Sequence, residues 1–177
     1  MTTHVRTATP GDVPALAALA ARTFPLACPP GSTAADQSVF VAAHLSPERF
    51  AHYVEDDGRI VLVATDGGPQ LLGYTMLVAG EPADPEVRAA LRVRPTIELS
   101  KCYVDAGHHG AGVSHALMSA SLDAARATGV AAVWLGVNQL NARAQAFYVR
   151  NGFERVGVKH FVVGTRVEDD FVYERTL

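Results

Sequence analysis

The sequence feature that most constrains the fold is a glycine-containing loop between a predicted strand and a predicted helix. The strand pattern TIELSKCYVD covers residues 96–105, and the helix pattern begins near Ser114. Between them lies HHGAGVS, which contains Gly110 and Gly112. Such a loop becomes a helix N-terminus, where the first N–H groups lack intrahelical partners and the dipole favours anions. The pattern favours a phosphate cradle over a simple turn, although neither GxGxxG nor the P-loop GK[ST] occurs in it.

A metal site at the same loop is the weaker alternative. No pair among His108, His109 and His115 has the i, i+4 spacing that brings two ligands to one helix face. The two cysteines, Cys28 and Cys102, are far apart in sequence and lack CxxC spacing, so they indicate neither a zinc site nor a disulfide framework. We therefore expect no metal cofactor.

Length and composition indicate one globular domain over residues 1–177. The chain is 49% hydrophobic and 19% charged, which suits a single core. No apolar stretch approaches the roughly 18 to 20 residues that span a bilayer, and Gly, Asp and Pro interrupt the N-terminal segment before a signal-peptide core forms. The net charge of −3 argues against a general nucleic-acid binder and leaves room for a small cationic partner. We expect a cytoplasmic protein without nucleic-acid or membrane partners.

Hydrophobic periodicity predicts a mixture of helices and strands, with a hairpin where two β-branched runs flank a glycine-rich turn. Such a mixture indicates an α/β or α+β domain with a mixed sheet. The expected helices are one that begins with Asp12 as its N-cap, one over about 36–45, one that begins with Ser46 as its N-cap, and two more over 114–129 and 141–152. The expected strands lie at 4–9, 59–65, 71–79, 96–105 and 131–137, with two more in the tail; short internal loops are expected at 25–33 and 79–86.

The strand at 96–105 carries an irregular pattern. Ile97 and Leu99 alternate onto one face, whereas Cys102 and Val104 have the opposite parity. One extra residue would reconcile the two halves, as in a β-bulge, which splays a strand and leaves backbone groups free for a ligand. A partly exposed strand with a mixed pattern is an equal alternative.

The helix at 141–152 places a tyrosine at the edge of its buried face. Leu140, Ala144 and Phe147 recur at helical spacing and are expected to face the sheet, which turns Tyr148 about 100° from Phe147. A tyrosine so placed keeps its ring packed while its hydroxyl reaches a cleft. A core aromatic with a solvated tip is the alternative for an isolated tyrosine.

Residues of about 96–160 resemble, in order, the acetyl-CoA-binding core of the GNAT N-acetyltransferase superfamily. The family's loop pattern Q/R-x-x-G-x-G/A falls on His109, Gly112 and Ser114, and Gly112 matches it strictly. The more specific pattern N-x-x-A-x-x-F-Y-x-x-x-G-F matches at Asn141, Ala144, Phe147, Tyr148, Gly152 and Phe153. The resemblance implies a central mixed, mostly antiparallel sheet of about seven strands, flanked by helices and splayed at an acetyl-CoA cleft.

The sequence also resembles a narrower branch of this superfamily. This resemblance rests on the stretch WLGV, on the motif just described, and on a closing pattern of His160, Phe161 and Gly164 followed by Asp170. This is the spermidine and diamine acetyltransferase branch typified by PaiA. The resemblance implies an acetyl-CoA-dependent N-acetyltransferase that acts on a small primary amine, with a polyamine as one candidate, and it leaves a homodimer open. Acetylation of a peptide or protein amine, and a CoA-binding module without turnover, are the alternative functions.

The resemblance also implies roles for individual residues. The backbone of Tyr103 and Val104 would hold the pantetheine and acetyl group, Asn141 would hold the pantetheine, and Tyr148 would bind CoA and protonate its sulfur. The pyrophosphate would lie on the loop His109, Gly110, Ala111, Gly112, Val113 and Ser114.

Acetyl transfer also needs a neutral amine, and therefore a group that removes its proton. Glu98, on the strand beside the expected site, is the candidate base, acting directly or through water; a merely solvated carboxylate is the alternative. Cys102 as an acyl-carrying nucleophile is weaker, because direct transfer needs no covalent intermediate. The acceptor pocket is expected from about 24–53 and the last two strands, with candidate acidic groups Glu55, Asp56, Asp57, Glu168, Asp169 and Asp170.

Overall fold

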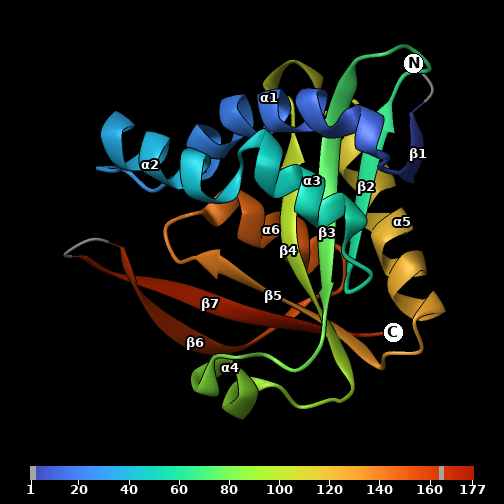
Figure 1. The fold of residues 1–177 in the computed structure, drawn as a ribbon. Coiled ribbons are helices and arrows are strands. Elements are labelled where there is room, and N and C mark those ends of the chain that lie inside the picture. Colours follow the sequence, from blue (N-terminus) through green and yellow to red (C-terminus); the bar gives the residue numbers. More distant parts are fainter. Residues whose placement is uncertain (1–2, 164–165) are drawn as a thin grey trace.

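A computed structural model describes residues 3–163 and 166–177 and shows one seven-stranded sheet (Figure 1). Its order is β1 (His4–Thr7), β2 (Arg59–Thr65), β3 (Leu71–Ala79), β4 (Thr96–Val104), β5 (Ala132–Asn138), β7 (Arg166–Thr176) and β6 (Glu154–Val163). Among the described strands, β4 and β5 form the one parallel pair, and the other neighbours are antiparallel. The predicted mixed, mostly antiparallel sheet is confirmed. Gly164 of the closing sequence pattern lies outside the described residues.

Helices cover both faces of this sheet. One face of β2 and β3 carries α1 (Val13–Thr23) and α3 (Pro47–Glu55), and the opposite face carries α5 (Val113–Ala127), as Figure 1 shows. Beside α1 lies α2 (Ala34–His44), and α6 (Ala142–Arg150) lies behind β4 and β5. The cores on the two faces are separate clusters, one around Phe50 and Tyr74 and the other around Met118 and Phe153.

The N-terminal caps differ in part from those predicted. Ser46 caps α3 as expected, because its hydroxyl accepts the backbone N–H of Arg49. The carboxylate of Asp12 does not cap α1. It accepts instead from the Thr9 backbone N–H at 2.8 Å and from the Arg6 guanidinium at 2.7 Å, because a 3₁₀ turn (Pro10–Asp12) precedes the helix and uses these groups.

One helix was missed; it begins at the end of the predicted loop 79–86 and continues beyond it. The short α4 (Pro85–Ala90) packs against β6, and Asp84 caps it by accepting the backbone N–H of Glu86. The sequence D-P-E carries this signal, since an N-cap aspartate followed by proline at the first helical position is a typical helix start. At six residues the helix is too short for hydrophobic periodicity to reveal it.

The irregular pattern of β4 is a β-bulge. Met76 of β3 pairs with Lys101, whereas the next residue, Leu77, pairs with Leu99, so Ser100 is the extra residue. The bulge restores the phase, so that Cys102 packs against the same core cluster as Leu99. The structure thus confirms the bulge over the alternative of a partly exposed, regular strand.

The bulge lies where β4 leaves β5. The two strands pair only from Thr96 to Glu98 on β4 and from Ala132 to Trp134 on β5, and beyond these residues they diverge. Among the described strands, none therefore pairs with the rest of β4 on that side. The splay predicted at the cofactor cleft is confirmed.

Candidate active site

Two hollows meet at the splay between β4 and β5. The larger hollow, of about 440 Å³, is lined by residues from 24–45, β4, β5, α6 and the β6–β7 hairpin. The smaller hollow, of about 340 Å³, is lined by residues from 23–27, the end of β4, the glycine loop and α6. Both linings contain the residues Ala27, Cys102, Tyr103, Asn141, Ala144 and Tyr148. A reaction between two ligands, one in each hollow, would therefore take place beside these shared residues.

The glycine loop forms one wall of the smaller hollow. Gly110 and Gly112 both have a φ of +83°, a left-handed conformation that side chains rarely adopt, and an added Cβ would meet open space at each. Gly112 is the N-cap of α5, so the loop ends at a helix N-terminus as predicted. These two conformations require glycine and leave backbone groups approachable.

The structure divides the predicted cofactor-binding residues into two sets. The smaller hollow brings together Tyr103, Val104, His109, Gly110, Ser114, Asn141 and Tyr148. Ala111, Gly112 and Val113 are not in its lining, and the side chain of Val113, the first residue of α5, is fully buried against β2 and β3.

Side chains fix the course of this loop. A ring nitrogen of His109, Nε2, lies 3.1 Å from the carbonyl oxygen of Val104, so the loop bonds to the end of β4. The carboxylate of Asp105 accepts the backbone N–H of Gly107 and binds Arg22 of α1 at 2.7 Å. The guanidinium of Arg22 helps to lower the pKa of Asp105, which keeps this ion pair charged.

Backbone groups of β4 point to the open edge at alternate residues. The N–H of Asp105 donates to the carbonyl of Leu72 on β3, so the preceding residue, Val104, directs its N–H and C=O away from β3. Two residues earlier, the N–H and C=O of Cys102 also point away from β3. The prediction that the Tyr103 backbone faces the cofactor is wrong, because that backbone faces β3; Tyr103 reaches both hollows through its side chain instead.

The next feature is the tyrosine of α6. Tyr148 makes edge contacts with Phe147 and Phe153, at ring-centroid distances of 5.5 and 5.8 Å. Burial raises the pKa of its hydroxyl well above the usual value, so the hydroxyl stays protonated and can act as a donor. Leu140, predicted on the same buried face, is 67% exposed because it lies in the turn before the helix begins.

Glu98 lies at the last pairing position before the splay and lines the larger hollow. Burial raises the pKa of its carboxyl, and the positive charges of Lys159 and Lys101 oppose this rise. Burial also lowers the pKa of Lys101. The Lys101 ammonium lies 5.5 Å from the ring centroid of Tyr53. Glu98 is therefore a half-buried carboxylate with a raised proton affinity, as a base requires.

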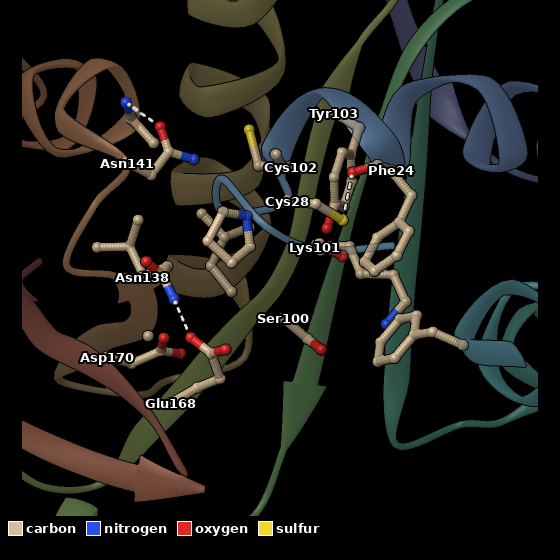
Figure 2. A pocket seen from close by; sticks show the side chains of 18 of the residues that line it. Phe24, Cys28, Ser100, Lys101, Cys102, Tyr103, Asn138, Asn141, Glu168 and Asp170 are labelled. Carbon is tan, nitrogen blue, oxygen red and sulfur yellow. Dashed lines mark hydrogen bonds between the residues drawn. The ribbon is translucent and has the colours of Figure 1, made fainter. Parts of the chain in front are cut away.

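Two of the predicted acidic candidates lie in the larger hollow, on β7. Glu168 accepts from the side-chain amide of Asn138 at 3.4 Å, and Asp170 lies beside it, as Figure 2 shows. Burial raises the pKa of Asp170 to about 6. The other candidates are exposed and outside the lining: Glu55, Asp56, Asp57 and Asp169.

The cysteines are poor nucleophiles in this environment. Burial raises the pKa of the Cys102 thiol to about 12, so the reactive thiolate is scarce near neutral pH. The Cys28 thiol donates to the carbonyl of Phe24, and burial raises its pKa as well. Among residues 3–163 and 166–177, no three His, Cys, Asp or Glu side chains gather as metal ligands, and no helix is long and apolar enough to cross a bilayer.

Comparison with known proteins identifies the family. The sequence profile of the Acetyltransferase (GNAT) family matches residues 19–153. This chain belongs to the GNAT acetyltransferase family. An uncharacterised N-acetyltransferase from Mycobacterium tuberculosis is 44% identical over 166 residues, which is 94% of this chain and 98% of that protein. A mycothiol acetyltransferase from Beutenbergia cavernae is 36% identical over 103 residues, covering 58% of this chain and 31% of that protein.

The fold of this GNAT enzyme is similar to that of a PaiA N-acetyltransferase from Thermoplasma acidophilum, solved with coenzyme A. The TM-score is 0.79 at 16% identity, and both chains are covered completely. Family membership and these relatives identify the chain as an acetyl-CoA-dependent N-acetyltransferase with acetyl-CoA as co-substrate. The alternative of a CoA-binding module without turnover is not supported.

Some residues of the larger hollow were not singled out from the sequence. Asp36 and Phe40 of α2, Lys101 of β4 and Lys159 of β6 all line it. Because α2 has no buried residue, its hydrophobic pattern does not mark which of its side chains face a ligand. The two lysines come from strands far apart in sequence, so their proximity to the acids depends on the tertiary fold.

Proposed function

We propose that this GNAT enzyme transfers the acetyl group of acetyl-CoA directly to a primary amine of a small cationic acceptor, a diamine or polyamine. The observation that carries this proposal is the charge of the larger hollow. Among the described residues of its lining, Lys101 and Lys159 are the lysines and there are four carboxylates: Asp36, Glu98, Glu168 and Asp170. An excess of carboxylates in a partly dry hollow raises the local concentration of cations.

Aromatic rings add to this preference for cations. Phe24 and Phe40 stack with their centroids 4.4 Å apart and an interplanar angle of 3°. Both line the larger hollow, and Phe40 is 37% exposed. Aromatic faces attract ammonium groups and also cover the methylene chain that separates the amines of a polyamine.

The size of the hollow favours a small acceptor over a protein. A volume of about 440 Å³ is within the roughly 300 to 1,000 Å³ of pockets that enclose small molecules. Residues 24–45 on one side and the β6–β7 hairpin on the other both contribute to its lining.

The smaller hollow is the proposed place of acetyl-CoA. The backbone edge at Cys102 and Val104 would pair with the pantetheine amides, and the loop from His109 to Ser114 would receive the pyrophosphate at the N-terminus of α5. The side-chain oxygen of Asn141 accepts the backbone N–H of Ala144 at 3.1 Å, so its amide N–H groups are the donors that it would offer to the pantetheine. Tyr103 would contribute its ring to both ligands.

Chemistry then takes place at the junction of the hollows. Glu98 takes a proton from the acceptor ammonium, directly or through water, and the neutral amine attacks the thioester carbonyl. The C–N bond forms, the C–S bond breaks, and the Tyr148 hydroxyl gives its proton to the departing sulfur of CoA. The nitrogen of the new amide loses its second proton to the Tyr148 oxygen through water, and the first proton returns to solvent from Glu98, so both side chains regain their starting forms and charge and protons balance.

A panel of acceptors tests the proposal. Release of free CoA thiol from acetyl-CoA is measured with putrescine, spermidine, lysine and a peptide with a free N-terminus. We expect the largest kcat/KM for putrescine or spermidine, because lysine and the peptide bring a carboxylate or a bulky chain into an acidic, enclosed hollow. A larger kcat/KM for the peptide would contradict the polyamine assignment and would favour acetylation of protein amines.

A further inference from the structure

Two side chains cross over a glycine in the floor of the larger hollow. A Cβ added to Gly136 of β5 would lie 2.8 Å from Cε of Lys159 and 3.2 Å from Oδ2 of Asp170. Lys159 of β6 and Asp170 of β7 are direct cross-strand partners, so both side chains extend from the same face of the hairpin. Gly136 thus makes room for Asp170 to direct its carboxylate into the hollow.

We infer that Asp170 binds the second ammonium group of the acceptor and so sets the preference for a diamine over a monoamine. This inference rests on the proposed function, in which Glu98 receives the reacting amine. Asp170 and Glu98 lie on strands on opposite sides of β5, and both line the larger hollow. One cationic acceptor can therefore contact both carboxylates within this single hollow.

Neighbouring charges leave a net negative field around Asp170. Lys159 stabilises its charged form, whereas Glu168 and Asp169 on the same strand disfavour it. Lys159 also stabilises the charged form of Glu98, so its single positive charge is shared between carboxylates. On the other elements around the hollow, Lys101 of β4 adds one positive charge and Asp36 of α2 adds one negative charge.

The adjacent residue provides a matched control. Side chains alternate along a strand, so Asp169 lies on the opposite face of β7 from Asp170. Its carboxylate is 3.5 Å from Nε2 of His160, and it is outside the lining of the hollow. Asp169→Asn therefore removes the same charge one residue away and leaves every residue that lines the hollow in place; because Asp169 disfavours the charged form of Asp170, this change favours the Asp170 carboxylate and cannot mimic its loss.

The experiment compares putrescine with 1-aminobutane, which has the same four-carbon chain and lacks the second amine. The ratio of their kcat/KM values cancels effects on the reacting amine and on acetyl-CoA. We expect this ratio to fall by about tenfold in Asp170→Asn, as expected for the loss of one charge-assisted hydrogen bond. It should be unchanged in Asp169→Asn and retained in large part in Asp170→Glu, which keeps the charge.

The pH dependence gives a second arm. The carboxylate of Asp170 is lost as the pH falls through its pKa of about 6, so the wild-type ratio should fall in the same range. In Asp170→Asn the ratio should be low and flat with pH.

The outcomes separate this inference from the proposed function. Preferred acetylation of putrescine with an equal ratio in wild type and Asp170→Asn would overturn the role of Asp170 alone. Failure of the wild type to acetylate either amine would overturn the proposed function, and the role of Asp170 with it.

Discussion

Replacing Tyr148 with phenylalanine should lower kcat by about 100-fold, which corresponds to about 3 kcal/mol of transition-state stabilisation. The change removes the hydroxyl and keeps the ring, whose contacts with Phe147 and Phe153 hold it in place. Because burial keeps the hydroxyl protonated, it can donate to the sulfur at any pH near neutrality. General acids contribute about 10²- to 10⁴-fold, and the lower end applies because a thiolate is a tolerable leaving group.

The measurement is steady-state kinetics with the preferred amine, together with the affinity for acetyl-CoA and the thermal midpoint of each variant. Affinity and midpoint should barely change. Tyr173→Phe is the matched control, since Tyr173 is a buried tyrosine of the same core cluster that lines neither hollow. If kcat is unchanged and only KM for acetyl-CoA rises, Tyr148 is a binding contact and the general-acid role is wrong.

Replacing Glu98 with glutamine should also lower kcat by about 100-fold at neutral pH, because the variant cannot accept the amine proton. The effect should depend on pH. The active form of a base is the deprotonated one, so kcat of the wild type rises with pH through the pKa of Glu98. Burial raises this pKa, which places the rise above the usual range of a glutamic acid. In Glu98→Gln this rise should disappear.

The pH profile of kcat is measured at saturating concentrations of both substrates, so that it reports groups of the bound complex and not acceptor binding at Asp170. Glu154→Gln serves as the control, because Glu154 is an exposed carboxylate on β6 outside both hollows. A Glu98→Gln variant that keeps the wild-type kcat and acid limb would show that another group, or water alone, takes the proton.

The sequence allowed prediction of the elements with a strong periodic pattern. The phase change within 96–105 indicated a bulge as one of two equal interpretations, because two pairs of apolar residues of opposite parity can share one face only with an extra residue between them, and the structure confirms the bulge. The motif of α6 predicted Tyr148 beside the cleft. Elements of low amphipathicity were located less well: α2 begins two residues earlier than expected, and the short α4 was missed.

The candidate site was predicted in part, for a physical reason. The proposed cofactor side is built largely from one strand–loop–helix unit together with the motif of α6, so local patterns and the family motif could indicate it. The acceptor side is assembled from segments as distant as Asp36 and Asp170, whose proximity depends on tertiary packing. Charge alone could not separate Asp170 from Asp169, because only the register of β7 decides which of the two faces the hollow.

The central claim is direct transfer between two ligands that occupy adjoining hollows at the same time. Initial rates measured while acetyl-CoA and putrescine are both varied test it most directly. Direct transfer through a ternary complex predicts double-reciprocal plots that intersect. Parallel lines, the kinetic sign of an acetylated enzyme intermediate, would contradict the account and would return attention to Cys102 as an acyl carrier.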